Sequence, residues 1–355
     1  LGGAAASYEL AAAVEWELGG WARQWSKRMP HLPPYRGPVA NDIEKLVKEI
    51  EGNSRIKVMT NATVAKTDGM PGKFTVAVKQ GAGEATLPVG AIVLATGWRP
   101  YDPGKLGHLG YGASPDVVTG VELEKMLSQG PVKRKSDGRA PKQIAFIQCA
   151  GSRDPNHLPY CSSVCCGVSI KQALQLVEAD PETSAYIIYD ELRTPGTAEE
   201  FYRQAQEAGV IFMKGKVKSV GADLTVVVDD ALLGEEVPMS GLDLVVLATG
   251  MVPNSTDAES ATSDKGADQL KNDINPLAPI KIAGYAAGAA PEAKWGPGPG
   301  LPQLGGSILN LQYRQGPHLP MLADGFADSH FICFPYETRR TGIYTCGPVR
   351  RPMDM

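Results

Sequence analysis

The sequence predicts an α/β fold with two dinucleotide-binding-type domains, each built on a parallel sheet. Two short apolar runs, at 91–97 and 244–250, both end in Ala-Thr-Gly. A run of this length closed by turn residues is typical of a buried strand, and its glycine lets the backbone leave the sheet where a nucleotide passes close by. Strands and helices alternate between the two runs, as in a doubly wound sheet. We therefore expect two related nucleotide-domain units in one chain.

The elements of the second unit follow one another in β-α-β-α-β order. A capping box at 197–200 opens the later helix, and Gly209 ends it. Another capping box, at 119–122, begins a short helix ahead of this unit. The expected strands and helices are a strand at 144–148, a helix at 162–177, a strand at 185–189, a helix from 197 to about 208 and a strand at 210–213.

The first unit begins with a shortened nucleotide motif. Gly2 and Gly3 resemble the remnant of a glycine-rich phosphate turn, and Glu15 is placed to bind a ribose hydroxyl. Positions 3 and 15 are only 12 apart, against about 20 in an intact unit. Either residues are missing, or Glu15 is an exposed carboxylate at a helix end. Gly19, Gly20 and Trp21 follow in a loop whose backbone amides could meet a pyrophosphate.

The predicted domain organisation is discontinuous. Residues 1–97 and 307–355 form the first domain, 98–141 a connection, 142–254 the second domain, and 255–306 an irregular segment rich in Gly, Ala and Pro. At the end of the strand in the first domain, Ala95, Thr96 and Gly97 are expected near the pyrophosphate or ribityl chain of a dinucleotide. The equivalent Thr249-Gly250 is expected to be structural, because its nucleotide site looks lost.

Composition and charge exclude several classes of function. Hydrophobic residues make up 43% and charged residues 21% of the 355 positions, which is typical of a soluble globular protein. With a net charge of −4 and no basic stripe, no nucleic-acid partner is expected, and the basic run at 133–139 is interpreted as a solvated linker. No run approaches the ~18–20 apolar residues of a membrane span. No secretory signal is recognised, and because residue 1 is Leu the sequence is consistent with a fragment.

Four of the six cysteines lie within 18 residues, at Cys149, Cys161, Cys165 and Cys166. Cys161 and Cys165 are four apart, which places them on one face of a helical turn, and Cys149 ends the preceding strand. Four thiolates at a helix N-terminus suit an anionic iron–sulfur cluster, because the free amides and the helix dipole stabilise its charge. A zinc site and a vicinal dithiol at Cys165–Cys166 are the alternatives.

The loop at 149–154 strengthens this interpretation. In a flavoprotein with two nucleotide sites it would carry the glycines that hold NAD(P)H, but here it reads Cys-Ala-Gly-Ser-Arg-Asp. We interpret this loop as part of a metal site in place of the loop that would bind the phosphates of NAD(P)H, so no NAD(P)H binding is expected there.

These motifs resemble a known family. Cys-Ala-Gly-Ser-Arg-Asp at 149–154, Tyr-Cys-Ser-x-Val-Cys-Cys at 160–166 and a lysine five residues later resemble the A subunit of heterodisulfide reductase and its relatives. Segments 308–317 and 334–344 are similar to the branch that includes the B subunit of the quinone-interacting membrane-bound oxidoreductase. The resemblance covers most of residues 15–355.

The resemblance implies a thioredoxin-reductase-like flavoprotein with FAD and a [4Fe–4S] cluster held by the four cysteines. Lys171 would lie near the flavin N5 and act in catalysis. FAD would contact 15–21, Val64 within 61–64, and 95–97. Cys346 and Gly347 stand where flavoproteins of this fold often have Ala-Gly-Asp.

The resemblance also implies partners and a location. The chain would be an electron-transfer subunit of a cytoplasmic complex, attached peripherally to the membrane through its partners. Those partners would be a flavoprotein like the one in heterodisulfide reductase, together with a quinone-reactive membrane subunit. The complex would link the quinone pool to sulfate-reduction enzymes such as adenylylsulfate reductase.

Two other functions stay open. One is a self-contained flavin disulfide reductase that uses Cys165–Cys166, and the other is a non-catalytic scaffold with a structural cluster. At the level of single residues, Lys171 could instead be a solvated helix lysine. Cys333 and Cys346 are expected to be small buried side chains, and Trp21 and Trp25 could either cover a flavin edge or pack in a core.

Overall fold

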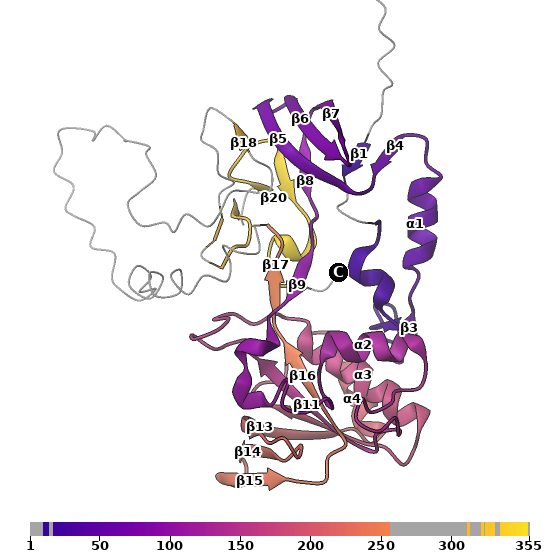
Figure 1. Cartoon of the computed structure of the whole chain (residues 1–355), viewed down its shortest axis with the longest axis vertical. Coiled ribbons are helices and arrows are strands. Elements are labelled where there is room, and N and C mark those ends of the chain that lie inside the picture. The colour runs from indigo at the N-terminus through magenta and orange to yellow at the C-terminus, as the bar shows by residue number, and fades with distance from the viewer. Residues whose placement is uncertain are drawn as a thin grey trace, which may run out of the picture.

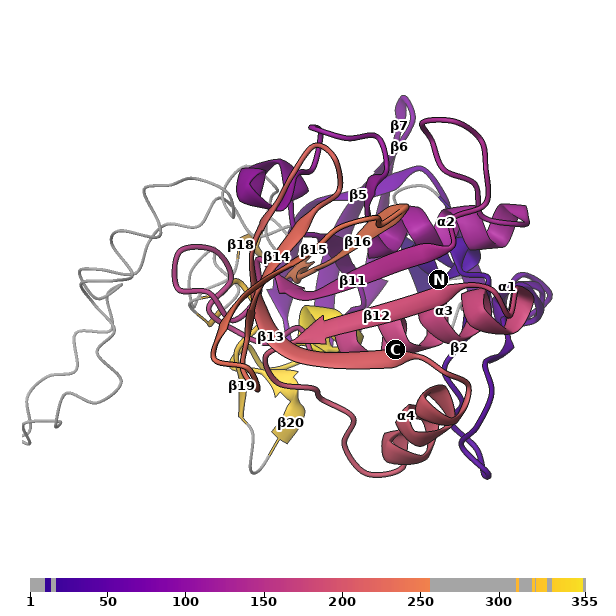
Figure 2. The same ribbon diagram turned by 90° about the horizontal axis from the view of Figure 1, so that it is seen from below.

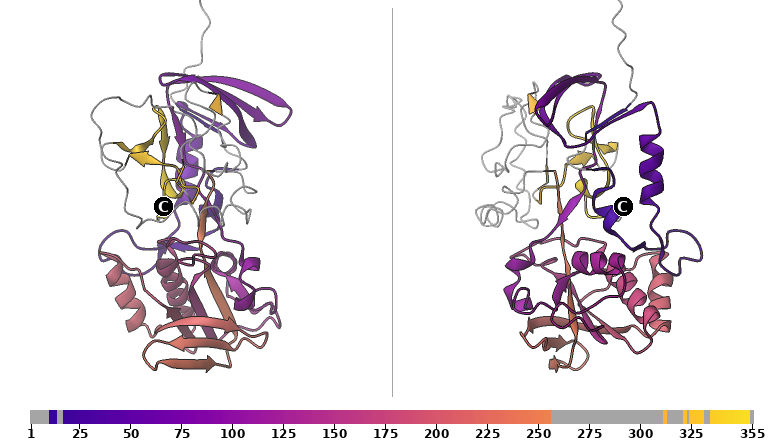
Figure 3. Two further views of the ribbon diagram at one scale, coloured as in Figure 1. Left: turned by 90° about the vertical axis from the view of Figure 1, so that its left-hand side faces the viewer. Right: turned by 45° about the vertical axis from the view of Figure 1, so that its right-hand side comes forward.

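The computed structural model describes residues 10–13, 17–255, 311–312, 321–322, 324–330 and 334–353. The described chain forms two parts stacked along the long axis of the molecule (Figures 1 and 3). A narrow antiparallel ribbon of β9 (Trp98–Pro100) and β17 (Met251–Pro253) joins them. The ends of the two Ala-Thr-Gly strands therefore meet at the junction between the parts.

The lower part is a seven-stranded sheet. The strands β10, β16, β11, β12 and β13 run parallel in this order, and Figure 2 shows β11, β12 and β13 side by side. Two further strands, β14 and β15, extend the sheet beyond β13 in antiparallel pairing. The bounds are β10 Val117–Thr119, β11 Gln143–Ala150, β12 Ser184–Tyr189, β13 Ile211–Val220, β14 Val226–Asp230, β15 Glu235–Met239 and β16 Leu244–Thr249.

The predicted strands of this sheet are confirmed, and five of its seven strands are parallel as expected. The sheet also differs from the prediction in two ways. β13 runs well past 213, and β14 and β15 were not anticipated. The sequence signal for β14 was the β-branched run Thr225–Val228. In the structure Val226, Val228 and Asp230 are buried in alternation with half-buried neighbours, the pattern of a strand with one covered face. The β14–β15 connection spans only four residues, which permits antiparallel pairing alone.

Three helices pack against this sheet, α2 (Gly120–Gln129), α3 (Cys165–Ala179) and α4 (Ala198–Glu207). Leu123, Ile170, Leu174 and Phe201 from these helices share one core with strand residues such as Phe146. Because β10 and α2 belong to this sheet and its cover, residues 98–141 are more than a connection.

One predicted capping box forms and the other does not. Thr119 Oγ1 accepts the Glu122 N–H at 3.1 Å, and the Glu122 carboxylate accepts the Thr119 N–H at 2.8 Å. At Thr197 the backbone is already helical and the side chain makes no capping hydrogen bond, so that prediction is wrong. An N-cap hydroxyl reaches the free amides only from an extended backbone. The predicted stop at Gly209 is confirmed by its φ of +93°.

The basic run at 133–139 is not the solvated linker that was expected. Arg134 forms ion pairs with Asp116 at 3.4 Å and Asp243 at 3.0 Å, and Asp116 is almost fully buried. The Ser136 backbone amide donates to Asp116 at 3.1 Å. These contacts fix the run against the ends of β10 and β16.

The upper part holds the meander β5 (Ala62–Met70), β6 (Lys73–Gln80) and β7 (Gly83–Val89). Its described strands are mostly antiparallel, which corrects the expected parallel sheet. Two-residue turns at Pro71-Gly72 and Gly81-Ala82 join the three strands, and so short a connection permits only antiparallel pairing.

Parallel pairs in the upper part bring together segments that are far apart in the sequence. β1 (Leu10–Ala13) pairs with β4 (Ile56–Met59), β8 (Ile92–Leu94) with β21 (Ile343–Thr345), and β5 with β18 (Leu311–Gln312). The C-terminal strands β18 and β21 therefore extend sheets whose other strands come from residues 62–94. The remaining elements are β2 Lys27–Arg28, β3 Val39–Ala40, α1 Ile43–Glu51, β19 Ser329–His330, β20 Phe334–Thr338 and the 3-10 turns Gly20–Gln24, Pro103–Lys105, Gly107–Leu109 and Gly347–Val349.

None of the helices in the described ranges has the length and apolar character needed to cross a membrane.

Candidate functional site

The four clustered cysteines line a single cavity of about 170 Å³, which we call the cysteine cavity. Cys149 lies near the end of β11, Cys161 lies in the following loop, and Cys165 and Cys166 are the first two residues of α3. The helix therefore presents its N-terminal amides and the positive end of its dipole to the cavity. Its other lining residues are Ser152, Arg153, Ser162, Ser163, Glu191, Leu192 and Arg193.

The loop that carries the cysteines has an unusual backbone. Cys149, Arg153 and Ser163 have φ values of +55°, +57° and +65°, in the left-handed region that non-glycine residues seldom adopt. They are half of the six such residues in the described ranges. Such strain persists only where the surroundings impose it, and it concentrates at functional sites.

Gly250 fixes the path of this loop. A Cβ at Gly250 would lie 2.4 Å from Leu158 Cδ1 and from Ser152 Oγ, so a larger residue there would force these two side chains to move. The Ser162 hydroxyl donates or accepts at Ser152 Oγ, 3.1 Å away, and accepts the Met251 N–H at 2.8 Å. The structural role that was expected for Gly250 is to hold the cysteine loop against the end of β16.

Burial controls the electrostatics of the thiols. It raises the pKa of Cys149 to about 11, with a smaller opposing effect from Arg153. It also raises the pKa of Cys165 and of Cys166. Without a cation these thiols hold their protons, and a bound metal would have to displace them. Hydrogen bonds to sulfur are already in place, since Cys161 accepts the Ser163 N–H at 3.3 Å and Cys166 accepts the Arg193 N–H at 3.4 Å.

The donor set of the cysteine cavity is four thiols. In the described part of the chain, no three Cys, His, Asp or Glu side chains are grouped to hold a metal ion. In a zinc site all ligands meet at one atom. A [4Fe–4S] cluster is different, because each thiolate binds its own iron at one corner. Four thiols around a cavity fit that donor set.

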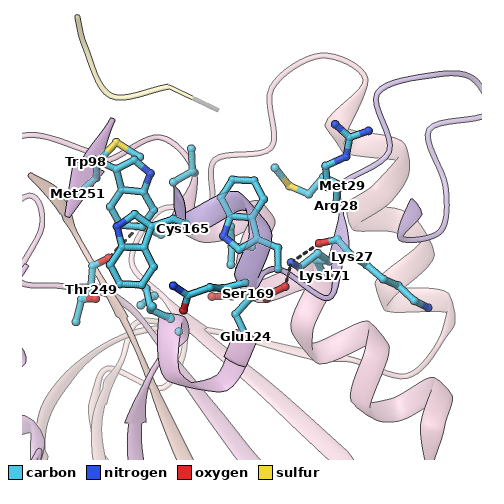
Figure 4. A pocket seen from close by; sticks show the side chains of 18 of the residues that line it. Lys27, Arg28, Met29, Trp98, Glu124, Cys165, Ser169, Lys171, Thr249 and Met251 are labelled. Atoms are coloured by element: carbon cyan, nitrogen blue, oxygen red, sulfur yellow. Dashed lines mark hydrogen bonds and ion pairs between the residues drawn. The ribbon is translucent and has the colours of Figure 1, made fainter. Parts of the chain in front are cut away.

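A second cavity, of about 370 Å³, lies beside the cysteine cavity (Figure 4). Three tryptophans are among the residues that line it, and we call it the tryptophan cavity. Trp21 and Trp98 are stacked with ring centroids 6.4 Å apart, and Trp25 also lines it. This size and aromatic lining suit a planar organic ring. Cys165 lines both cavities, so it is part of their common wall. The other lining residues are Gln24, Lys27, Arg28, Met29, His31, Gly120, Val121, Glu124, Val164, Val168, Ser169, Lys171, Ala248, Thr249, Met251 and Met353.

Lys171 lines the tryptophan cavity but is only 4% exposed. Its Nζ lies 2.6 Å from Glu124 Oε1 and donates to the Lys27 carbonyl at 2.7 Å (Figure 4). Lys171 is thus not the solvated helix lysine that was the alternative. Nothing in the sequence singled out Glu124, because its partner lies 47 positions away. Its only local signal was a carboxylate beside the buried Leu123.

The predicted FAD contacts are distributed over the upper part and the junction. Gly19 and Gly20 have φ values of +91° and +43° and precede Trp21, which reaches the tryptophan cavity. Val64 packs in the hydrophobic core of the upper part. Ala95, Thr96 and Gly97 line neither cavity.

At the junction, Thr96 Oγ1 donates to the Asn254 carbonyl at 2.8 Å. Cys346 is exposed rather than buried as expected, and it lies just beyond the last residue of β21, Thr345. Its N–H donates to the Leu94 carbonyl at 2.8 Å, which brings Cys346 and Gly347 next to Ala95. Gly2, Gly3, Glu15 and Cys333 lie outside the described residues.

Comparison with known proteins identifies relatives. No protein-family model matches the chain. It is 38% identical over 227 residues to the A subunit of the H₂/formate:CoB-CoM heterodisulfide,ferredoxin reductase of Methanococcus maripaludis, which covers 58% of this chain and 34% of the relative. It is 42% identical over 181 residues to an iron–sulfur A subunit of the CoB–CoM heterodisulfide reductase of Methanopyrus kandleri, covering 47% of this chain and 27% of the relative. The chain thus spans about a third or less of the length of these curated relatives.

Among solved structures, thioredoxin reductase of T. acidophilum has a TM-score of 0.49 at 13% identity, over 96% of this chain and 81% of that one. A bacillithiol disulfide reductase of Bacillus cereus has a TM-score of 0.40 at 14% identity, over 69% and 71%.

Proposed function

Because the chain is a relative of the A subunits of heterodisulfide reductases, we propose that it is an FAD- and [4Fe–4S]-containing electron-transfer part of a multi-subunit oxidoreductase. The observation that carries the proposal is the pair of adjoining cavities. One is lined by four cysteines, the other by stacked tryptophans, and Cys165 belongs to both.

The cysteine cavity would hold the cluster through Cys149, Cys161, Cys165 and Cys166. The α3 N-terminus and the guanidinium groups of Arg153 and Arg193 would offset its negative charge. Backbone donors to Cys161 and Cys166 are already aimed at sulfur, and such bonds tune the potential of a cluster.

The tryptophan cavity would hold the flavin ring. The remaining FAD contacts are proposed at Gly19–Trp21, Val64, 95–97 and Cys346–Gly347. When bound, a flavin exchanges both electron pairs and single electrons, while a cluster carries one electron at a time. The tryptophans of this chain would orient the ring and exclude water from it, and Lys171 would set the charge beside it.

The partners are part of the proposal, which rests here on the relatives and on the resemblance of segments 308–317 and 334–344 to the quinone-linked branch. The names of the relatives describe subunits of heterodisulfide reductases that use H₂, formate, ferredoxin or coenzyme F420. For this chain we propose other redox subunits as donor and acceptor. Adenylylsulfate reductase and a quinone-reactive membrane subunit are the specific candidates, with peripheral membrane attachment in the cytoplasm.

The disulfide-reductase alternative is not favoured by the geometry. Cys165 and Cys166 are consecutive residues of α3. Side chains at i and i+1 of a helix point about 100° apart and do not face one another. A disulfide between them would require the first turn of α3 to unwind. The scaffold alternative, in which the cluster has no redox function, is distinguished from the proposal by testing whether the cluster can be reduced and re-oxidised.

Visible absorption and metal analysis of the anaerobically purified protein test the proposal. We expect flavin bands together with a broad shoulder near ~400 nm, and about four irons per chain. A cluster that dithionite cannot reduce and the flavin cannot re-oxidise would favour the scaffold alternative. One zinc per chain, or neither chromophore after reconstitution with iron, sulfide and FAD, would refute the proposal.

A further inference from the structure

The floor of the tryptophan cavity contains a buried pair of opposite charges. Lys171 and Glu124 have side chains that are 5% and 6% exposed, and their charged atoms lie 2.6 Å apart. Both line the cavity, Lys171 from α3 and Glu124 from α2 (Figure 4). In so poorly solvated a place, the field of a single charge would extend far into the cavity. A paired opposite charge cancels most of that field.

Glu124 is held in one orientation by further donors. Its Oε1 also accepts the Ser26 N–H at 2.9 Å and the Ser26 hydroxyl at 3.2 Å. Its Oε2 accepts from Gln172 Nε2 at 2.8 Å, and the same amide donates to the Gly120 carbonyl. The carboxylate therefore cannot turn away from Lys171 without losing several hydrogen bonds at once. Lys171 is held in turn by the Lys27 carbonyl.

We propose that Glu124 is a positioning residue that holds Lys171 and cancels most of its charge, and that it thereby lowers the reduction potential of the flavin in the tryptophan cavity. This inference rests on the proposed function. Reduction adds negative charge to a flavin, so an uncompensated ammonium beside it favours the reduced form. Removal of the Glu124 charge alone should therefore make reduction easier.

The test is the midpoint potential of the protein-bound flavin, measured by equilibration with reference dyes. For Glu124→Gln we expect at least a tenfold shift toward the reduced form, which is about 30 mV for a two-electron couple. The matched control is Glu122→Gln on the same helix. Glu122 pairs with Lys135 and lines neither cavity, and glutamine keeps its capping box. The control should leave the potential unchanged.

A double variant keeps the test decisive if Glu124→Gln does not fold. Glu124→Gln with Lys171→Met removes both charges and leaves neither one buried without a partner. We expect its potential to match that of the unmodified protein, while Lys171→Met alone shifts it toward the oxidised form. If the double variant shifts as far as Lys171→Met, Glu124 does not compensate Lys171 and the inference is overturned. The same follows if Glu124→Gln binds flavin and only loses stability. If the unmodified protein binds no flavin, it is the proposed function that fails.

Discussion

At the scale of single residues, Cys165 links the two halves of the candidate site. It begins α3, lines both cavities, and its S–H lies 3.7 Å from the Thr249 carbonyl as a donor. The other three cysteines line the cysteine cavity alone among the two described cavities. Loss of any cysteine should remove the cluster, but only changes at Cys165 should also alter the tryptophan cavity.

Cys161→Ser should abolish the cluster and keep the flavin. Cys161 contacts the cysteine cavity only, and the proposed flavin contacts lie elsewhere. We expect less than one iron per chain and loss of the ~400 nm shoulder, with FAD still at one per chain. Ser163→Ala is the control, since it keeps the backbone N–H that Cys161 accepts. Four irons in the Cys161→Ser protein would exclude Cys161 as a ligand.

Gly250→Ala should destabilise the protein and displace the cysteine loop. The added Cβ would overlap Leu158 and Ser152, which is overpacking that costs about 1–3 kcal/mol. Stability toward urea and iron content should both decrease relative to the unmodified chain. Gly90→Ala, where a Cβ meets nothing within 4 Å, serves as the control. Unchanged stability and iron content would show that the loop relaxes freely.

At the scale of elements, α2 joins the two parts of the molecule. Its Glu124 accepts hydrogen bonds from Ser26 in the N-terminal segment, while Leu123 packs in the core of the sheet. Its N-terminus is capped by Thr119, which also ends β10. The position of β10 is in turn fixed by the contacts of Asp116 with the 133–139 run. The stability of β10 and of the start of α2 therefore depends on the buried carboxylate of Asp116.

Asp116→Asn should make the stability of the protein less sensitive to acid. Burial alone would raise the pKa of Asp116, but hydrogen bonds from Ser136 and the Arg134 guanidinium lower it overall. A lowered pKa means that the stabilisation is present above the unfolded-state value of about 3.9 and is lost as pH falls through the folded-state value. At pH 7 we expect a loss of about 1.5–3 kcal/mol in the free energy of unfolding, because the charged acceptor is lost while Arg134 keeps its ion pair with Asp243.

This difference should shrink as the pH is lowered below about 4, because Asp116 of the unfolded chain takes up a proton there while the folded protein, with its lowered pKa, still holds the carboxylate ionised. Denaturant unfolding of both proteins as a function of pH measures the difference in their free energies of unfolding. Asp137→Asn is the control, since Asp137 is on the same run but more exposed. A difference that stays constant from pH 7 to pH 3 would mean that the charge of Asp116 is not what stabilises the fold.

At the scale of the whole molecule, the second sheet has the strand order of a nucleotide fold, but cysteines follow its strand β11. β11 leads into the cysteine loop, where the glycines of a dinucleotide site would stand. Cys149 and Arg153 instead occupy that turn with side chains that line the cysteine cavity. The same fold would then position a metal cluster at the carboxyl end of the parallel strands.

Titration with NADH or NADPH should detect no saturable binding at the second sheet. Calorimetry or nicotinamide fluorescence on the complete chain measures this, with Arg153→Ala as the companion variant because Arg153 lies in the loop where a phosphate would be held. Saturable binding that weakens in Arg153→Ala would contradict the prediction. If the nucleotide binds the Arg153→Ala variant as tightly as the unmodified protein, its site lies elsewhere in the molecule.

The sequence alone was sufficient for features carried by neighbouring residues. The buried strand that ends in Ala-Thr-Gly at 244–250, the Thr119 capping box and the stop at Gly209 are each formed by a few consecutive positions, whereas the first such run gives only the short β8 with an exposed Val93. The grouping of the cysteines was visible for the same reason, since they lie on one strand end, one loop and one helix start. Thr197 shows the limit, because the capping pattern was present but the backbone before the helix was not extended.

Tertiary structure alone decided which distant residues share a cavity. Trp21 and Trp98 stack across 77 positions, and Ser26 reaches Glu124 across 98. By its sequence Lys171 could equally be a surface lysine, but in the structure it is buried and its ammonium bonds to Glu124 of α2 and to the Lys27 carbonyl. Local periodicity reports which face of an element is apolar, but not which element will cover that face. The burial of an ionic pair depends on that choice, because a charge is retained in the interior only where the fold brings its partner to it.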